Sequence, residues 1–295
     1  MRWVDAHTHT KHDSKDARQS LDELLREADQ KALMAVCLTE HYDKDSIDGR
    51  LRRGVTAVGA EPDPAEWAFN PERYLKRLSP IRTARQKGGQ TRLLLGIEVN
   101  FAPYLSADYR RYLEPLPFDQ IIYSAHFYED RDIYWAKDLY RRGKEIFYPQ
   151  WLTWQLELLE DPFQFQVFGH YDYVARYAPY EQKRLLYREF PDHLDAILKQ
   201  LIRREAALEI NTKAFYTSEP DPQSAGPETI DNYLDADLIR RYLDLGGELV
   251  TLSSDSHQAG CLALGFDLYA KRLYELGLRR LCYFVEKKPR FLHLD

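Results

Sequence analysis

The sequence has few cysteines and no long apolar run. Its three cysteines, Cys37, Cys261 and Cys282, are scattered over 295 residues, which excludes a disulfide framework or a zinc finger. No stretch approaches the ~18 consecutive apolar residues of a membrane-spanning helix, and the opening MRWVDAHTHT lacks the apolar core of a signal peptide. We therefore expect a cytoplasmic protein without a membrane partner.

An excess of positive charge is also missing. The 41 Lys and Arg residues are outnumbered by 47 Asp and Glu residues, for a net charge of -6, which argues against a nucleic-acid partner held by bulk charge. The P-loop, GxGxxG and GxSxG signatures are absent, so neither a nucleotide-binding fold nor a serine hydrolase gains support.

What the sequence does contain is a repeated order of short apolar run, polar side chain, loop and helix. Continuous apolar runs of this length predict parallel strands buried on both faces. Between them lie helix signals such as the capping box at Ser20 and Glu23 and the cap with a first-turn proline at Asn70 and Pro71. Seven such units predict one α/β barrel domain over residues 1–295. Its strands are expected at residues 3–6, 33–39, 93–99, 118–125, 165–169, 207–210 and 249–252.

Three connections that follow strands, residues 42–70, 127–149 and 213–232, are longer than chain closure requires. In a barrel such loops rise on the catalytic face, so they are either lids over a site or tolerated surface insertions. The second connection contains Tyr134 and Trp135, which would shape a substrate pocket or pack against the barrel rim. Its acidic residues Glu129, Asp130 and Asp132 would suit a cationic substrate.

Six of the nine histidines fall at the carboxyl ends of predicted strands, together with two carboxylates. A single histidine there is more often a hydrogen-bonded structural residue than a metal ligand. Eight such groups in successive units are hard to explain by packing, because buried polar groups need partners, and metal ions supply them. A set of imidazole and carboxylate ligands around a metal ion suits zinc, iron(II) or manganese. The residues are His7, His9, His41, Glu98, His126, His170, Asp255 and His257.

These residues stand in motifs that resemble a known family. HTH at 7–9, TEH at 39–41, GIEVN at 96–100, SAH at 124–126, GHYDYV at 169–174 and SSDSH at 253–257 are similar to motifs of the PHP (polymerase and histidinol phosphatase) superfamily. EINT at 209–212 and EKKPRF at 286–291 look like the monofunctional histidinol-phosphate phosphatases. The resemblance implies a distorted (β/α)7 TIM-like barrel with its active site at the C-terminal strand ends. It also implies a metal-dependent phosphomonoesterase of histidine biosynthesis whose small-molecule substrate is L-histidinol phosphate.

The resemblance further implies three divalent metal ions. The first would take His7, His9, Glu98 and Asp255, and the second would share Glu98 and add His126 and His170. The third would take His41, His257 and one residue of the SKDA segment, with Asp16 preferred over His12. A hydroxide bridging two ions would attack phosphorus. The catalytic set would be His7, His9, Glu98, His126, Asp255 and His257, with His41 also at the substrate.

Other interpretations stay open. Arg176 either donates to a phosphate as a bidentate partner or lies on the surface, and Asp172 is expected to orient a ligand histidine. The protein would otherwise be a PHP phosphoesterase for a nucleotide or phosphotyrosine, or an inactive PHP-like binding module, which the intact ligand positions disfavour. An amidohydrolase-type barrel would need a carbamylated lysine or an equivalent bridge, whereas Glu98 occupies the bridging position.

Overall fold

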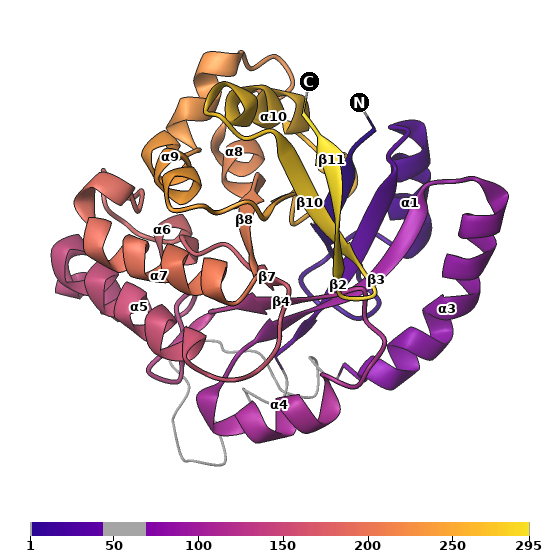
Figure 1. The fold of residues 1–295 in the computed structure, drawn as a ribbon, viewed down its shortest axis with the longest axis horizontal. Coiled ribbons are helices and arrows are strands. Elements are labelled where there is room, and N and C mark those ends of the chain that lie inside the picture. Colours follow the sequence, from indigo (N-terminus) through magenta and orange to yellow (C-terminus); the bar gives the residue numbers. More distant parts are fainter. Residues whose placement is uncertain (1, 44–68, 295) are drawn as a thin grey trace.

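Seven parallel strands form the centre of the molecule in the computed structural model, which describes residues 2–43 and 69–294 (Figure 1). Their order in the sheet is β1-β2-β3-β4-β7-β8-β9, so that successive βα units are neighbours. Each predicted strand is confirmed, with ends shifted by a few residues: β1 and β2 run on into the polar residues at their carboxyl ends, whereas β4 and β7 are shorter than predicted. The strands are β1 (Val4–Thr8), β2 (Ala35–Tyr42), β3 (Arg92–Asn100), β4 (Gln120–Ser124), β7 (Val167–Phe168), β8 (Ala207–Asn211) and β9 (Val250–Ser253).

The first and last strands meet and nearly close the sheet into a barrel. Thr8 and Ser256 form a parallel bridge, and the N–H of His9 donates to the carbonyl of Ser256 at 2.9 Å. Asp5, fully buried in β1, accepts from the N–H and the hydroxyl of Ser254 just after β9. The predicted seven-stranded barrel is thereby confirmed.

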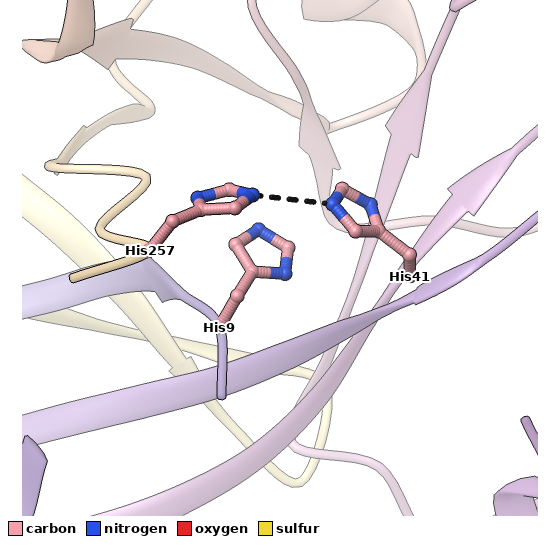
Figure 2. A group of neighbouring side chains, drawn as sticks. All are labelled: His9, His41 and His257. Carbon is pink, nitrogen blue, oxygen red and sulfur yellow. Dashed lines mark hydrogen bonds between the residues drawn. The ribbon is translucent and has the colours of Figure 1, made fainter. Parts of the chain in front are cut away.

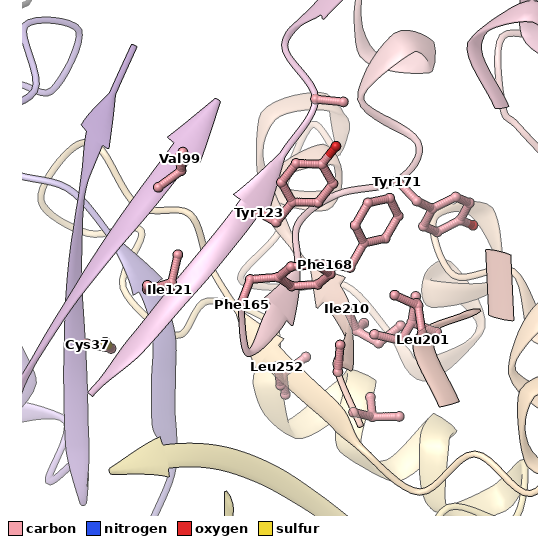
Figure 3. Close-up of a cluster of buried hydrophobic side chains, with 14 of the residues drawn as sticks. Cys37, Val99, Ile121, Tyr123, Phe165, Phe168, Tyr171, Leu201, Ile210 and Leu252 are labelled. Atoms are coloured by element: carbon pink, nitrogen blue, oxygen red, sulfur yellow. The ribbon is translucent and has the colours of Figure 1, made fainter. Parts of the chain in front are cut away.

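Helices pack around the strands and bury an apolar face against them. Ser20 and Glu23 form the predicted capping box, and the Asn70 side chain accepts from the N–H of Arg73. Figure 3 shows the packing between strands and helices, where Tyr123 of β4 stacks on Phe168 of β7 and Leu201 comes from α7. Within the described chain, no helix is long and apolar enough to cross a membrane. The helices are α1 (Leu21–Gln30), α3 (Pro71–Gly88), α4 (Ser106–Tyr112), α5 (Lys144–Leu159), α6 (Tyr173–Arg176), α7 (Pro191–Arg203), α8 (Lys213–Ser218), α9 (Ala236–Asp244) and α10 (Phe266–Glu275).

A C-terminal hairpin that the sequence reasoning did not anticipate closes the amino end of the barrel. Its strands β10 (Arg280–Val285) and β11 (Lys288–His293) are antiparallel. Cys282 and Phe284 of β10 pack in the barrel interior against Ile122, Val167 and Ala207. The turn of the hairpin binds the residue that precedes β4, since Glu286 and Lys287 donate their N–H groups to Asp119. The EKKPRF segment therefore lies at the end of the barrel opposite the strand-end histidines.

The long connections contain more regular structure than expected. Residues 44–68 of the first lie outside the described part of the chain. The second forms β5 (Phe127–Tyr128), β6 (Arg131–Asp132) and a 3-10 helix (Lys137–Arg142) before α5 begins. Pro149 was expected to end this loop but lies inside α5, where the burial of neighbouring Phe147, Tyr148 and Trp151 offsets the missing N–H. The third contains α8 and a 3-10 helix (Pro227–Asn232).

Candidate metal centre

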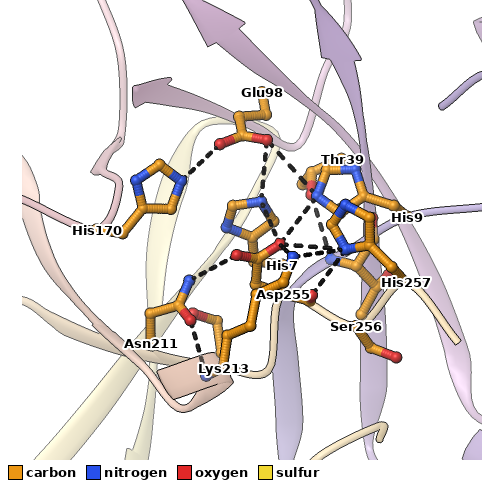
Figure 4. Close-up of polar contacts among 12 residues, drawn as sticks. His7, His9, Thr39, Glu98, His170, Asn211, Lys213, Asp255, Ser256 and His257 are labelled. Carbon is orange, nitrogen blue, oxygen red and sulfur yellow. Dashed lines mark hydrogen bonds and ion pairs between the residues drawn. The ribbon is translucent and has the colours of Figure 1, made fainter. Parts of the chain in front are cut away.

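The carboxylate of Glu98 lies at the centre of the histidine cluster. It projects from β3 and is 1% exposed. Its Oε2 lies 3.3 Å from Nε2 of His7 and 3.5 Å from Nε2 of His9. Its Oε1 lies 2.9 Å from Nε2 of His170 and 3.2 Å from Nε2 of His126. Oε2 also lies 2.8 Å from Nδ1 of His41. The two oxygens thus face separate groups of rings (Figure 4 labels Glu98, His7, His9 and His170), which is the arrangement that a carboxylate bridging two cations requires.

The donor atoms of this cluster fit a metal. Nε2 of His7, Nε2 of His9 and Oε2 of Glu98 are buried and have no hydrogen-bond partner in the part of the chain that the structure describes. These three residues offer ligand atoms that all lie within 4.8 Å of one another. Buried polar atoms without partners carry a free-energy cost that a bound cation removes. Imidazole with carboxylate is a donor set for zinc, iron or manganese.

Asp255 completes the same side of the cluster, and two cationic side chains contact its carboxylate. Its Oδ1 lies 3.4 Å from Nε2 of His9 and accepts from Nζ of Lys213 at 3.0 Å. Its Oδ2 accepts from Nη1 of Arg176 at 2.9 Å and from the amide of Asn211 at 3.2 Å. Four residues from three chain segments therefore hold one carboxylate, and Figure 4 labels His9, Asn211 and Lys213 around Asp255.

A second group of histidine rings lies next to the cluster around Glu98. His41 and His257 approach through their Nε2 atoms at 3.4 Å, with His9 beside both (Figure 2). Oδ2 of Asp16 lies 2.9 Å from Nε2 of His257 and 3.4 Å from Nε2 of His41. The side chain of His12 is 63% exposed and pairs with Asp13 instead. The structure thus brings Asp16, and not His12, to the rings with which it was predicted to share an ion.

The two ring nitrogens of His41 contact different groups of residues. Its Nδ1 lies 2.8 Å from Oε2 of Glu98, whereas its Nε2 faces His257 and Asp16. Ligand atoms of His41, Glu98 and His126 come within 4.8 Å of one another. The ring of His41 therefore lies between the two groups, whereas the predicted assignment placed it with the third ion alone.

Behind these rings lies a carboxylate that sequence reasoning missed. Glu209 of β8 is 2% exposed, and its Oε1 lies 2.7 Å from Nδ1 of His7. Its Oε2 accepts from the N–H of His170 at 2.6 Å. Asp172 was expected to orient a histidine, but Nδ1 of His170 has no partner within the described residues, so that expectation is wrong. A charged residue inside an apolar strand run, as in ALEIN, was the signal available for Glu209.

The cluster perturbs the protonation of its members. Burial disfavours the charged form of His7, yet Glu98, Glu209 and Asp255 raise its pKa to about 10. Burial also disfavours the charged form of His126, but Glu98 and Asp43 raise its pKa to about 10. Burial opposes ionisation of Glu98 too, but the surrounding histidines hold the pKa of its carboxyl well below its usual range.

Burial dominates at two other rings of the cluster. It lowers the pKa of His9, together with the nearby His41 and His257, and it lowers the pKa of His170 despite the hydrogen bond to Glu98. Strong shifts of opposite sign within one cluster are typical of functional sites.

The cluster lies at the floor of a cavity of about 860 Å³ at the carboxyl ends of the strands. Residues from both described long connections line its walls, which favours a role in the site over that of surface insertions. The second connection contributes Asp132, Tyr134 and Trp135, and the third contributes Lys213 and Tyr216. Of the three acidic residues expected to receive a cationic substrate, only Asp132 lines this cavity; Glu129 pairs with Arg142 outside it.

Among the described residues, four cations line the cavity, Lys15, Arg18, Arg176 and Lys213. Two of them, Arg176 and Lys213, contact Asp255, and only Arg176 was predicted to bind phosphate. Arg176 lines the cavity with a side chain 11% exposed, so its surface alternative is wrong. Lys213, which begins α8, lies 2.9 Å from Nδ1 of His257 as well as close to Asp255. Its place two residues after β8 matches the strand-end positions of the histidines. Only acids and histidines had been considered at those positions.

Comparisons with known proteins agree with this geometry. A family model described as "PHP domain" matches residues 5–213. A probable histidinol-phosphatase of Clostridium acetobutylicum is 27% identical over 96% of this chain and 97% of its own length. The histidinol-phosphatase of Lactococcus lactis subsp. lactis is 28% identical over 88% of this chain and 86% of its own length.

Solved structures share the fold. The crystal structure of histidinol phosphate phosphatase from Lactococcus lactis, complexed with Zn, L-histidinol and phosphate, aligns with a TM-score of 0.79. It is 26% identical and the alignment covers 98% of this chain and 99% of that one. A putative histidinol phosphatase from Listeria monocytogenes aligns with a TM-score of 0.65 at 17% identity, which shows the fold alone.

Proposed function

Since this chain belongs to the PHP domain family, we propose that it is a metal-dependent phosphomonoesterase that hydrolyses L-histidinol phosphate to L-histidinol and phosphate. The observation that carries the proposal is the buried carboxylate of Glu98, whose two oxygens face separate groups of histidines at the floor of a cavity. The relatives named histidinol-phosphatase, which match nearly the whole chain, support this choice of substrate.

We assign the metal ligands as His7, His9, Glu98 and Asp255 for one ion, and Glu98, His126 and His170 for a second. Asp16, His41 and His257 would hold a third. When bound, divalent ions supply Lewis acidity toward phosphate oxygens and lower the pKa of water from 15.7 to about 7. The residues keep the site dry and rigid, because all of them except Asp16 and His257 are buried.

Phosphate binding is assigned to the cations at the cavity wall. Arg176 and Lys213 both lie within 3.0 Å of the Asp255 carboxylate and both line the cavity. A guanidinium offers five donors in a fixed fork, so one bond to Asp255 leaves others for phosphate oxygens. His41, between the two groups of ligands, also lines the cavity and would contact the same phosphate.

The upper wall suits the rest of the substrate. Tyr173 packs beside His126 and His170, and Tyr177 and Tyr134 continue the aromatic surface outward with ring centroids 5.0–5.1 Å apart. Asp132 lies on the same wall. Aromatic faces with a carboxylate favour a flat, nitrogen-bearing, cationic group, as the imidazole and ammonium of histidinol provide.

Phosphate release from a panel of phosphomonoesters tests the proposal. The metal-loaded protein and the same protein after chelation are assayed with histidinol phosphate, a nucleoside monophosphate and phosphotyrosine. We expect kcat/KM to be highest for histidinol phosphate, and chelation to abolish turnover until metal is restored. Preference for another ester would support the proposed metal-dependent hydrolysis but contradict the proposed substrate. Absence of turnover on every ester with metal bound would favour the non-catalytic binding module.

A further inference from the structure

Glu40 and Ser14 lie behind His9, buried and outside the proposed ligand set. Glu40 belongs to β2, and Ser14 belongs to the loop that follows β1. We propose that Glu40, acting through the hydroxyl of Ser14, fixes the tautomer of His9 so that its Nε2 lone pair faces the metal position. This positioning role rests on the metal centre proposed above, but it does not depend on the identity of the substrate.

Within residues 2–43 and 69–294, the hydrogen bonds of the Glu40 carboxylate all come from donors. Its Oε1 accepts from the hydroxyl of Thr10 at 2.5 Å, and its Oε2 accepts from the hydroxyl of Ser14 at 2.5 Å. The N–H of Thr10 lies 3.1 and 3.2 Å from the two oxygens. Glu40 and Ser14 are 0% exposed and Thr10 is 1% exposed. A carboxylate that receives these donors at close range directs the Ser14 proton toward itself.

The single hydroxyl proton of Ser14 decides the state of His9. Ser14 Oγ gives that proton to Glu40 and accepts from the N–H of His41 at 3.1 Å. Its remaining contact among the described residues is Nδ1 of His9 at 3.3 Å. Because the hydroxyl has no second proton to donate, the ring must donate from Nδ1. The lone pair then lies on Nε2, which is buried beside Glu98 and Asp255.

His7 has the same arrangement without an intermediary. Its Nδ1 contacts the carboxylate of Glu209 directly at 2.7 Å, and its Nε2 likewise faces Glu98. Metal-binding histidines usually donate their second ring N–H to a carboxylate, a carbonyl or water, and this partner sets the tautomer. The two neighbouring rings of the HTH motif are therefore oriented by different carboxylates, one directly and one through a hydroxyl.

The hydrogen bonds that run from Nδ1 of His9 to Ser14 and from Ser14 to Glu40 form a relay. Glu40→Gln is expected to reverse the direction in which this relay donates protons. Thr10 presents two donors, so the amide oxygen is expected to face Thr10 and the amide NH2 to face Ser14. Ser14 would then accept from the amide and donate its own proton to Nδ1 of His9. That moves the ring proton to Nε2, where it blocks metal binding. A lost partner behind a metal ligand typically weakens metal affinity roughly tenfold to a hundredfold.

Two readouts independent of turnover test the relay. Long-range 1H–15N correlation spectra of 15N-histidine-labelled, chelated protein report the tautomer, with the His9 signal assigned by its loss in His9→Asn. We expect Nδ1–H in the wild type and Nε2–H in Glu40→Gln, with weaker binding of one Zn²⁺ equivalent in the variant. Circular dichroism and the melting temperature check that each variant folds.

Variants of Ser14 keep the test decisive if Glu40→Gln does not fold. Ser14→Ala should weaken binding of the same equivalent, whereas Ser14→Thr retains the hydroxyl and should bind Zn²⁺ like the wild type. Thr10→Val removes the other hydroxyl on Glu40 and should leave the His9 tautomer unchanged. A wild-type His9 protonated at Nε2, or undiminished Zn²⁺ binding in folded Ser14→Ala, would overturn the proposal. Neither outcome depends on whether histidinol phosphate is hydrolysed.

Discussion

Arg176 donates a hydrogen bond from Nη1 to Oδ2 of Asp255 across 2.9 Å, which ties a guanidinium at the cavity wall to a carboxylate of the candidate metal centre. The guanidinium also lies over the ring of Tyr173, whose centroid is 5.6 Å from Cζ. Arg176 is thus held in place before any phosphate arrives. A preorganised cation loses little conformational entropy when it binds an anion.

Removing this guanidinium should weaken phosphate binding. We expect Arg176→Ala to raise KM and the inhibition constant of inorganic phosphate roughly tenfold to a hundredfold, since a charge-assisted hydrogen bond contributes ~1.5–3 kcal/mol. Metal content at saturating metal should be kept, because Asn211 and Lys213 still hold Asp255. Arg240→Ala, at a surface position 54% exposed, serves as the control. An unchanged phosphate inhibition constant would remove Arg176 from the phosphate site.

Neutralising the central carboxylate should disable the centre. Glu98→Gln replaces an anion that faces two groups of histidines with a neutral amide, which bridges cations poorly. Turnover should fall to near background, and metal content measured by atomic emission should decrease. Normal metal content together with normal turnover would show that Glu98 is not the bridge.

The loop after β1 offers a paired test of the third ion. Asp16→Ala should lose about one metal equivalent and most activity, because Asp16 lies against His41 and His257. His12→Ala should change neither, because its ring is exposed. Metal analysis of the two folded variants side by side decides between them, and loss of the ion only in His12→Ala would reverse the assignment.

Glu209 should act on metal affinity from behind the ligands. Its oxygens accept from the hydroxyl of Ser253 and the N–H of His170 as well as contacting His7. In Glu209→Gln, the amide nitrogen must face one of these donors. We expect metal affinity to fall roughly tenfold to a hundredfold, measured by competition with a chromogenic chelator. Exposed Glu228→Gln is the matched control and should bind metal normally.

Metal loading should release protons. In chelated protein the pKa of His7 and of His126 is raised to about 10, so both rings are protonated at pH 8, whereas a metal ligand must be unprotonated. Affinity should therefore rise with pH up to about these pKa values. Calorimetric titration at pH 8 in two buffers of different ionisation enthalpy should give different apparent heats. Identical heats would show that the rings are already neutral.

The sequence alone determined the barrel and most of the candidate site. Parallel strands buried on both faces read as continuous apolar runs. Six of the seven runs here lead into a candidate histidine or acid within a short motif, the exception being the run at residues 207–210. Because a barrel gathers the carboxyl ends of its strands on one face, local order along the chain was enough to bring Glu98 together with the histidines. The same reasoning could not reveal the hairpin at residues 280–293, because its place depends on filling the far end of that barrel.

Only the tertiary structure decided which groups hold these side chains in place. Glu209 contacts His7 across 202 positions of sequence, and Arg176 reaches Asp255 across 79. Nothing near His7 in the chain indicates Glu209, and nothing near Arg176 distinguishes a buried cation from one on the surface. A hydrogen bond depends on distance and direction between side chains, which the closure of the barrel sets, whereas the apolar pattern along a chain records only which faces are buried.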